Sequence, residues 1–162
     1  DSVLAGTLDE RYKDVFAEEK MVENEVLLMS PEGRKTNLSK VLKGLKGKVI
    51  YVDFWATWCR PCCAEMEPAA RLRNEMEGKD VDFIYLSTDE EHADMCGSLE
   101  KLQLKGCKVY RILNPKAARF MYEYKIDLIP RYMLINKNGI IVNDNAPRPS
   151  SEEIRQQITG LL

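Results

Sequence analysis

Apolar positions along the chain follow strand-like and helix-like spacings in turn, and their order predicts an α/β fold. The segment KVIYVDFWA, residues 48–56, is an almost unbroken run of apolar, β-branched and aromatic residues. Such a run is typical of a parallel strand that is covered on both faces. VDFIYLSTD at 81–89 and CKVYRIL at 107–113 predict two further strands. We expect the first run to be the central strand.

Helical patterns separate these runs. The segment PCCAEMEPAARLRNEMEG, residues 61–78, places Pro61 in a first turn, where no backbone donor is needed. It ends at Gly78, and Pro68 predicts a kink inside it. Further helices are predicted over about 90–102 and 114–126, and a last one in SSEEIRQQITGLL, which opens with a serine cap.

Hairpin signals occur near both ends of the chain. Residues 1–25 have a helical spacing, and 25–39 then predict a short strand, a turn and a second short strand, with Ser39 capping a brief helix. PRYMLINKNGIIVND, residues 130–144, predicts two strands joined by a Lys-Asn-Gly turn. Crossover connections give parallel pairs and hairpins give antiparallel ones, so we expect a mixed sheet flanked by helices.

Length and charge exclude several classes of protein. A chain of 162 residues fits one domain, which we divide into an N-terminal extension (1–30) and a core (31–162). Lys and Arg total 24 against 26 Asp and Glu, a net charge of −2 with both signs mixed, so nucleic acid is not an expected partner. No apolar run reaches the ~18–20 residues of a membrane helix. The composition predicts a soluble protein with no membrane span.

The segment VDFWATWCRPCC, residues 52–63, carries the candidate chemistry. Cys-x-x-Cys at a strand-to-helix junction indicates redox chemistry. Cys59 would lie at the helix N-terminus, where backbone N–H groups lower a thiol pKa, and is the expected nucleophile. Cys62, one turn further, is the expected resolving thiol. Arg60 and Pro61 between them are expected to tune the potential, although Arg60 could simply be solvated.

Asp53 is an acid inside a strand predicted to be covered on both faces. Desolvation should raise its pKa, and it could then exchange a proton with Cys62 directly or through water. It is therefore the candidate general acid/base. The alternative is a structural carboxylate that only satisfies hydrogen bonds.

The remaining cysteines do not suggest a metal site. A structural zinc would need two more ligands, and Cys63, Cys96, Cys107 and His92 show no paired spacing. We expect Cys63 to pack as a small buried residue, with reaction on over-oxidation as the alternative. Pairing of Cys96 with Cys107 stays open. His92 is expected on the surface.

VDFWATWCRPC and IPRYMLINKNGIIV resemble the thioredoxin superfamily, over about residues 48–162. With the lead-in segment, the chain is most similar to the extracytoplasmic TlpA/ResA-like branch. The resemblance implies a thioredoxin fold with an N-terminal helical and hairpin extension. It also implies that Ile129-Pro130 is a cis-proline dipeptide, and that Trp58, Ile129 and Pro130 form a docking edge for substrate. Tyr85 occupies the position of the family's lysine partner to the buried acid, so that way of tuning Asp53 is not carried over.

The resemblance implies a thiol-disulfide oxidoreductase that acts on protein substrates. The Arg-Pro dipeptide and the Ile before the proline favour reduction, with electrons from a membrane-bound donor. We expect no cofactor besides a redox-active Cys59–Cys62 disulfide, and a monomer. The expected location is periplasmic or otherwise extracytoplasmic, with a leader or lipid anchor absent from a chain that begins at Asp1; cytoplasmic is the alternative.

Two competing functions stay open. A thiol peroxidase would usually have a Thr-x-x-Cys site, and here Thr57 stands only two residues before Cys59. The other is a non-enzymatic binding module that keeps the fold and a silent disulfide.

Overall fold

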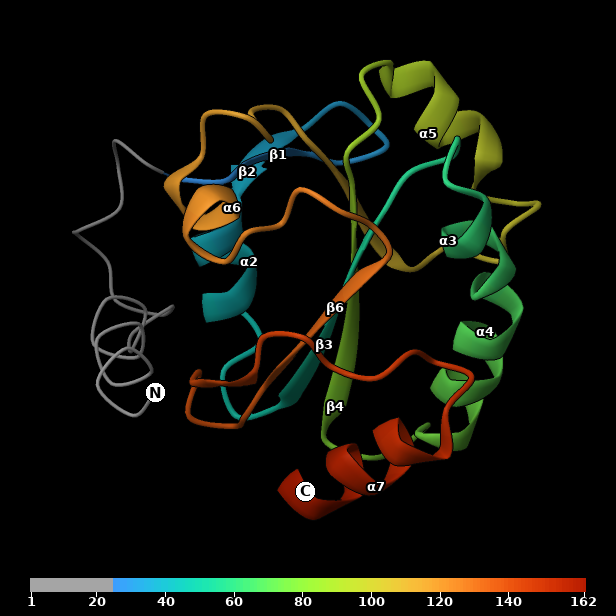
Figure 1. Ribbon diagram of the computed structural model, residues 1–162, viewed down its shortest axis with the longest axis vertical. Helices are drawn as coiled ribbons and strands as arrows, with labels where there is room; N and C mark the ends of the chain where they lie inside the picture. Colours follow the sequence, from blue (N-terminus) through green and yellow to red (C-terminus); the bar gives the residue numbers. More distant parts are fainter. Residues whose placement is uncertain (1–24) are drawn as a thin grey trace.

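A computed structural model describes residues 25–162 (Figure 1). The helix predicted over 1–25 falls outside these residues, apart from its last position. The described chain forms a seven-stranded mixed sheet in the order β2-β1-β5-β4-β3-β6-β7. The strands are β1 (Leu27–Met29), β2 (Lys35–Asn37), β3 (Val49–Trp55), β4 (Val81–Ser87), β5 (Lys108–Ile112), β6 (Arg131–Ile135) and β7 (Ile141–Asn143).

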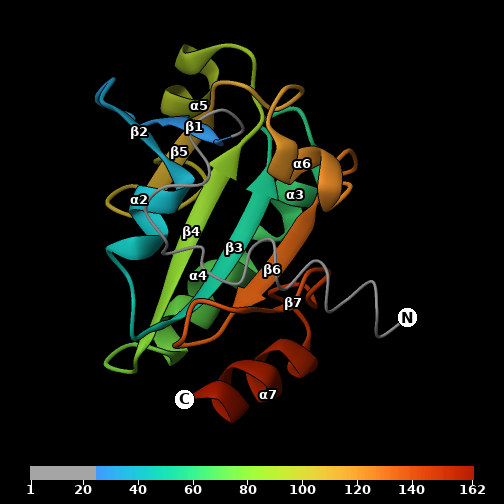
Figure 2. The ribbon, with the colours of Figure 1, turned by 90° about the vertical axis from the view of Figure 1, so that its left-hand side faces the viewer.

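Helices cover both faces of this sheet (Figures 1 and 2). They are α2 (Leu38–Lys43), α3 (Arg60–Ala64), α4 (Met66–Glu75), α5 (His92–Ser98), α6 (Arg119–Glu123) and α7 (Glu152–Leu161). One apolar cluster joins one face of the sheet to α4, α5 and α7, and a second joins the other face to α2 and α6. The predicted architecture, a mixed sheet between helices, is confirmed.

β3 is buried along its whole length. It pairs in parallel with β4 and antiparallel with β6, so it is enclosed at both edges as predicted, although β4 holds the middle position of the seven. Side chains alternate between the two faces of a strand. Val49, Tyr51 and Trp55 therefore join the cluster with α4 and α7, while Ile50, Val52 and Phe54 join the cluster with α2 and α6.

The helix predicted from Pro61 is divided in two. α3 ends at Ala64, Glu65 lies between, and α4 begins at Met66. Pro68 has no N–H to donate to the Ala64 carbonyl, and its ring crowds that carbonyl. The predicted kink is therefore confirmed as a break one turn before the proline, and it places Glu65 at the joint.

Three local predictions were wrong. The helices expected over 90–102 and 114–126 are shorter than predicted, because only α5 (His92–Ser98) and α6 (Arg119–Glu123) are helical there. Lys125 has φ 53°, a left-handed conformation that a helix cannot continue through. α5 already ends at Ser98, and Gln103 (φ 58°) lies just beyond the other predicted segment. α2 is capped by Asn37, whose Oδ1 accepts from Lys40 N at 2.8 Å, because Ser39 instead donates its hydroxyl to Glu25.

β1 links the N-terminal hairpin to the main sheet through antiparallel pairing with β5. Leu28 is fully buried there, whereas its neighbour Leu27 is 44% exposed. Leu28→Ala should lower the free energy of unfolding by about 2–5 kcal/mol, because it leaves a cavity. Leu27→Ala should cost well under half of that. Urea unfolding followed by tryptophan fluorescence measures both, and equal losses would show that the hairpin is not part of the core.

Candidate active site

Cys59 and Cys62 form a disulfide where β3 passes into α3. Cys59 is the N-cap residue of α3, and its Sγ accepts from the Cys62 amide at 3.3 Å. An amide directed at Sγ would favour a thiolate there once the disulfide is reduced. Cys59 is 4% exposed and Cys62 1%, so the pair is nearly enclosed and Cys59 is the more accessible.

The loop before Cys59 is held by Asp89, a residue that the sequence reasoning missed. Both carboxylate oxygens of Asp89 lie 3.1 Å from Thr57 N, and the Thr57 hydroxyl donates to Oδ1 at 2.7 Å. The Ser87 hydroxyl donates to the other oxygen at 2.6 Å. Asp89 follows β4 at the carboxyl edge of the parallel pair, where functional groups gather. Its position after a predicted strand was a usable signal.

Trp58 and Ile129 both line a cleft of about 700 Å³. Trp58 is 70% exposed, and Ile129 packs against the cluster that contains both cysteines. The Ile129–Pro130 peptide is cis, as the resemblance implied. Arg60 and Pro61 are exposed in the first turn of α3. Neither they nor Pro130 belong to the cleft lining.

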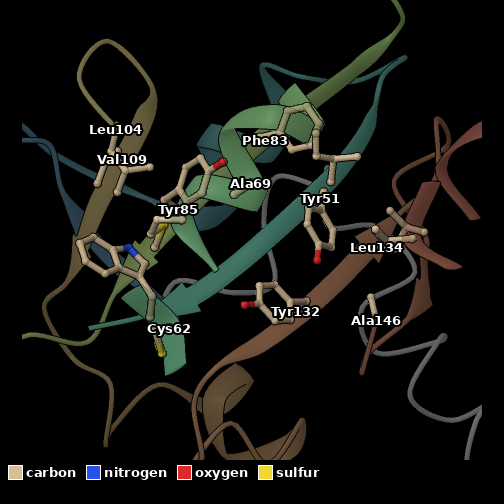
Figure 3. Close-up of a cluster of buried hydrophobic side chains, with 14 of the residues drawn as sticks. Tyr51, Cys62, Ala69, Phe83, Tyr85, Leu104, Val109, Tyr132, Leu134 and Ala146 are labelled. Atoms are coloured by element: carbon tan, nitrogen blue, oxygen red, sulfur yellow. The ribbon is translucent and has the colours of Figure 1, made fainter. Parts of the chain in front are cut away.

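Asp53 lies among aromatic side chains on the face of β3 toward α4. It is 2% exposed, and its partners in register are Tyr85 on β4 and Tyr132 on β6. Figure 3 shows these tyrosines in one cluster with Tyr51 and Cys62. Within residues 25–162, Asp53 Oδ1 has no hydrogen-bond partner. Burial raises the pKa of Asp53 well above its usual range, the charge of Glu65 raises it further, and Arg73 opposes both.

Arg73 brings a cation to this region from α4. Its Nη1 donates to the Tyr85 hydroxyl at 2.5 Å, and its guanidinium carbon lies 5.4 Å from the centroid of the same ring. Its Nη2 donates to the Gln103 carbonyl at 2.7 Å. Tyr85, which the resemblance places where the family has a lysine partner to the buried acid, therefore accepts a hydrogen bond from Arg73. Sequence spacing within a helix could not show which residue this arginine reaches.

Glu65 is a second buried acid that the sequence reasoning missed. It is 6% exposed at the joint between α3 and α4, and its Oε1 accepts from the Ser150 hydroxyl at 2.6 Å and the Ser150 amide at 3.2 Å. Its charge raises the pKa of Asp53. Glu65 stands three residues after Cys62 and one before Met66, both buried, so its spacing in a helical segment was a usable signal for an inward-facing acid.

The other three cysteines are free, so Cys96 and Cys107 do not pair with each other. Cys63 is only partly buried, and its Sγ lies 3.6 Å from the Thr57 carbonyl. Burial and then the charge of Asp89 raise the pKa of Cys63. His92 is half-buried rather than on the surface as expected, with Nε2 3.3 Å from the Pro31 carbonyl.

The described residues contain neither a candidate metal site nor a helix that could span a membrane. Over 25–162, no group of three or more His, Cys, Asp or Glu side chains is arranged to hold a metal ion. No helix in this part of the chain has the length and apolar character needed to cross a bilayer.

The sheet order, the cis-proline and the disulfide at the end of β3 define a redox enzyme of the thioredoxin type. The model of the Redoxin family matches residues 17–158, so the chain belongs to the Redoxin family. It is 30% identical over 131 residues to the thiol-disulfide oxidoreductase ResA of Bacillus cereus, covering 81% of this chain and 69% of that protein. These matches identify it as a TlpA/ResA-like thiol-disulfide oxidoreductase.

Solved structures agree with this assignment. The crystal structure of a candidate thiol-disulfide oxidoreductase from Bacteroides vulgatus is 34% identical, with a TM-score of 0.71 over 90% of this chain and all of the other. The exposed lipoprotein thioredoxin of Streptococcus pneumoniae is 22% identical, with a TM-score of 0.64 over 85% of this chain and 99% of the other. The second likeness shows the fold alone.

The raised pKa of Asp53 predicts a pH dependence of stability. The folded protein holds the proton more tightly than the unfolded chain, whose aspartate pKa is about 3.9. Stability from this group is therefore present at low pH and is lost as the pH rises toward the folded pKa, by about 1.4 kcal/mol for each unit of upward shift. Asp53→Asn should remove this loss, so its advantage over the wild type should grow as the pH rises from about 4 toward the pKa of Asp53 in the folded protein.

Denaturant unfolding at a series of pH values measures this difference. The exposed Asp144→Asn serves as a control that should follow the wild-type profile. Parallel profiles for Asp53→Asn and the wild type would contradict a raised pKa.

Proposed function

We propose that the protein reduces disulfides in other proteins, with Cys59 as the nucleophile and Cys62 as the resolving thiol. The observation that carries this proposal is the disulfide at the start of α3, with the Cys62 amide directed at Cys59 Sγ and the exposed Trp58 beside it. Cys59 is the better placed of the two to attack, since it is the more accessible. The Arg60-Pro61 dipeptide and Ile129 before the proline support the reducing direction.

The reaction is a thiol-disulfide exchange in two steps. The Cys59 thiolate attacks one sulfur of a substrate disulfide, an S–S bond forms to Cys59, and the substrate's other sulfur leaves as a thiolate that takes up a proton. Cys62, as a thiolate, then attacks Cys59 Sγ and releases the second substrate thiol. Two electrons pass to the substrate, and the protein is left with its Cys59–Cys62 disulfide. A protein dithiol must reduce this disulfide before the next cycle.

Asp53 is the proposed proton carrier for Cys62. The Cys62 thiol must lose a proton before it can attack, and a carboxylate whose pKa is raised by burial is a stronger base for that proton than an ordinary carboxylate. Asp53 lies on the sheet face against which Cys62 packs, in a region closed to bulk water. Arg73 keeps the pKa of Asp53 from rising further, and this makes the carboxylate form accessible.

The substrate chain would dock along Trp58, Ile129 and Pro130, with Arg60 and Pro61 at the outer side of the turn. Exposed large apolar side chains beside a reactive group mark a site for another protein. We further propose a monomer without organic cofactor or metal, located outside the cytoplasm and supplied with electrons by a membrane-bound protein dithiol. The resemblance of VDFWATWCRPC and its lead-in segment to the extracytoplasmic TlpA/ResA-like branch supports this setting.

Peroxide is a poorer substrate candidate than a protein disulfide. The Thr57 hydroxyl that precedes Cys59 donates to Asp89 at 2.7 Å, so it is already engaged in holding the loop. A binding module with a silent disulfide would neither form a mixed disulfide with a substrate protein nor catalyse its reduction, and trapping detects both reactions.

Trapping tests the proposed roles of the two cysteines. Cys62→Ala should accumulate a mixed disulfide between Cys59 and a substrate protein such as oxidised insulin, because nothing remains to release it. Cys59→Ala should accumulate none, and Cys63→Ala should turn over like the wild type. Mass spectrometry under non-reducing conditions measures the adducts. An adduct on Cys62 in the Cys59→Ala variant at the same rate would reverse the assignment.

Removing the carboxyl group tests the role of Asp53. Asp53→Ala should slow release from the mixed disulfide by roughly 10²-fold or more, the usual contribution of a positioned acid/base. The loss should be largest below about pH 8, where free thiolate is scarce. Stopped-flow tryptophan fluorescence measures the resolution step. A rate equal to the wild type from about pH 6 to 9 would leave Asp53 as a structural residue only.

A further inference from the structure

The cleft beside the disulfide carries the most exposed apolar side chains of the described chain. Among large apolar residues in 25–162, Tyr122, Leu128 and Trp58 are the most exposed, at 83%, 78% and 70%. Tyr122 and Trp58 line the cleft, and Leu128 directly precedes Ile129 in its wall. The residues that line the cleft come from Trp58, from the segment between β4 and α5, and from the segment around α6. Figure 1 shows where these two segments lie. The cleft includes Trp58 and Ile129 of the proposed docking edge.

Acidic residues outnumber basic residues in the lining of this cleft. They are Asp89, Glu90, Glu91, Asp94 and Asp127, against one cation, Lys116. The whole chain has 26 acidic and 24 basic residues, so this ratio is a local enrichment. A second cavity, of about 470 Å³, has the opposite lining, with four cations and no acid: Arg34, Lys35, Lys40 and Lys108. Charge is therefore sorted between two sites on the surface.

Four of the five cleft acids are available to a ligand. Glu90, Glu91, Asp94 and Asp127 are exposed, and none of them forms an ion pair within the described part of the chain. Two cations offset part of the charge, Lys116 and Arg111, whose Nη1 donates to the Glu90 carbonyl at 3.2 Å. The fifth acid, Asp89, is buried and used by the loop before Cys59. The four exposed acids thus share the cleft with the apolar side chains of Trp58, Tyr122 and Ile129.

We propose that this cleft selects substrate polypeptides in which Lys or Arg, next to an apolar residue, flanks the disulfide cysteine. The inference rests on the proposed function and names its substrate class. Trp58, Tyr122 and Ile129 would cover the apolar residue, while the four acids would face the cation. Clefts lined by one sign of charge raise the rate of encounter with ligands of the opposite sign by 10- to 10³-fold. An acidic segment would be repelled from the same surface.

Exchange with matched peptides tests this selection. Three disulfide-linked peptides differ only beside the cysteine, where they carry two Lys, two Gln or two Glu next to one Leu. The reduced protein is mixed with each, and its oxidation is followed by alkylation and mass spectrometry. Flanking charge also changes the reactivity of the peptide itself, so each rate constant is divided by that of the same peptide with dithiothreitol. At about 10 mM ionic strength the corrected Lys-to-Glu ratio should be at least about tenfold.

Salt and two triple variants locate the effect. Near 1 M salt, where the Debye length is about 3 Å, the ratio should approach one. The triple variant Glu90→Gln, Glu91→Gln, Asp94→Asn should also lose most of the ratio. Its control, Glu77→Gln, Asp80→Asn, Glu152→Gln, removes the same formal charge from exposed positions outside the cleft lining and should keep it. Each ratio is internal to one protein, so a general loss of activity does not imitate the result.

The outcomes separate the two proposals. Equal corrected rates for the three peptides, or an equal loss of the ratio in both triple variants, would overturn the selection while exchange itself continues. If no peptide oxidises the reduced wild-type protein, the proposed function fails and the selection fails with it.

Discussion

Burial of β3 on both faces is the constraint on which the rest of the site depends. A strand that is enclosed by β4, β6 and two layers of helices leaves little room for solvent, and Asp53 lies in its middle. Desolvation of that carboxylate is then unavoidable and costs free energy. The same burial fixes the end of β3, so the loop that follows delivers Cys59 to a defined place at the start of α3. β3 thus determines both the position of Cys59 and the buried environment of Asp53.

Three acids are buried on the segments that lead to and from the disulfide or beside them, and each has a different set of partners. Asp89 is satisfied by hydroxyl and amide donors and holds the loop. Glu65 accepts two hydrogen bonds from Ser150 and fastens the segment before α7 to the joint between α3 and α4. Asp53 keeps one oxygen without a partner among the described residues. Of the three carboxyl groups, that of Asp53 is therefore the one whose protonation state is least fixed by hydrogen bonds.

The strand and turn patterns predicted most of the fold because they are local. The apolar runs at β3, β4 and β5, the hairpin of β6 and β7, and the serine cap of α7 all follow from neighbouring residues. The helices α5 and α6 are shorter than predicted, and for α6 the positive φ at Lys125 is not encoded in helix propensity. The positions of the two active-site cysteines followed from one motif.

The surroundings of the motif could not be predicted in the same way. Arg73 reaches Tyr85 from another element, and Asp89 reaches Thr57 across 32 positions. Such contacts depend on how α4 and β4 lie against β3, and no periodicity in the chain records that placement. The partner of Glu65 was hidden for a related reason, because Ser150 lies 85 positions further along the chain. The family resemblance supplied the cis-proline, which residue patterns alone did not indicate.

The two outermost strands of the described sheet, β2 and β7, have three residues each. A long bare strand at such a border offers a row of unpaired amides and carbonyls to any other extended chain. Short ones offer few, so strand addition from another molecule is discouraged at either side. A protein that must repeatedly meet unfolded or partly folded chains can then hold them at its redox end without recruiting them into its own sheet.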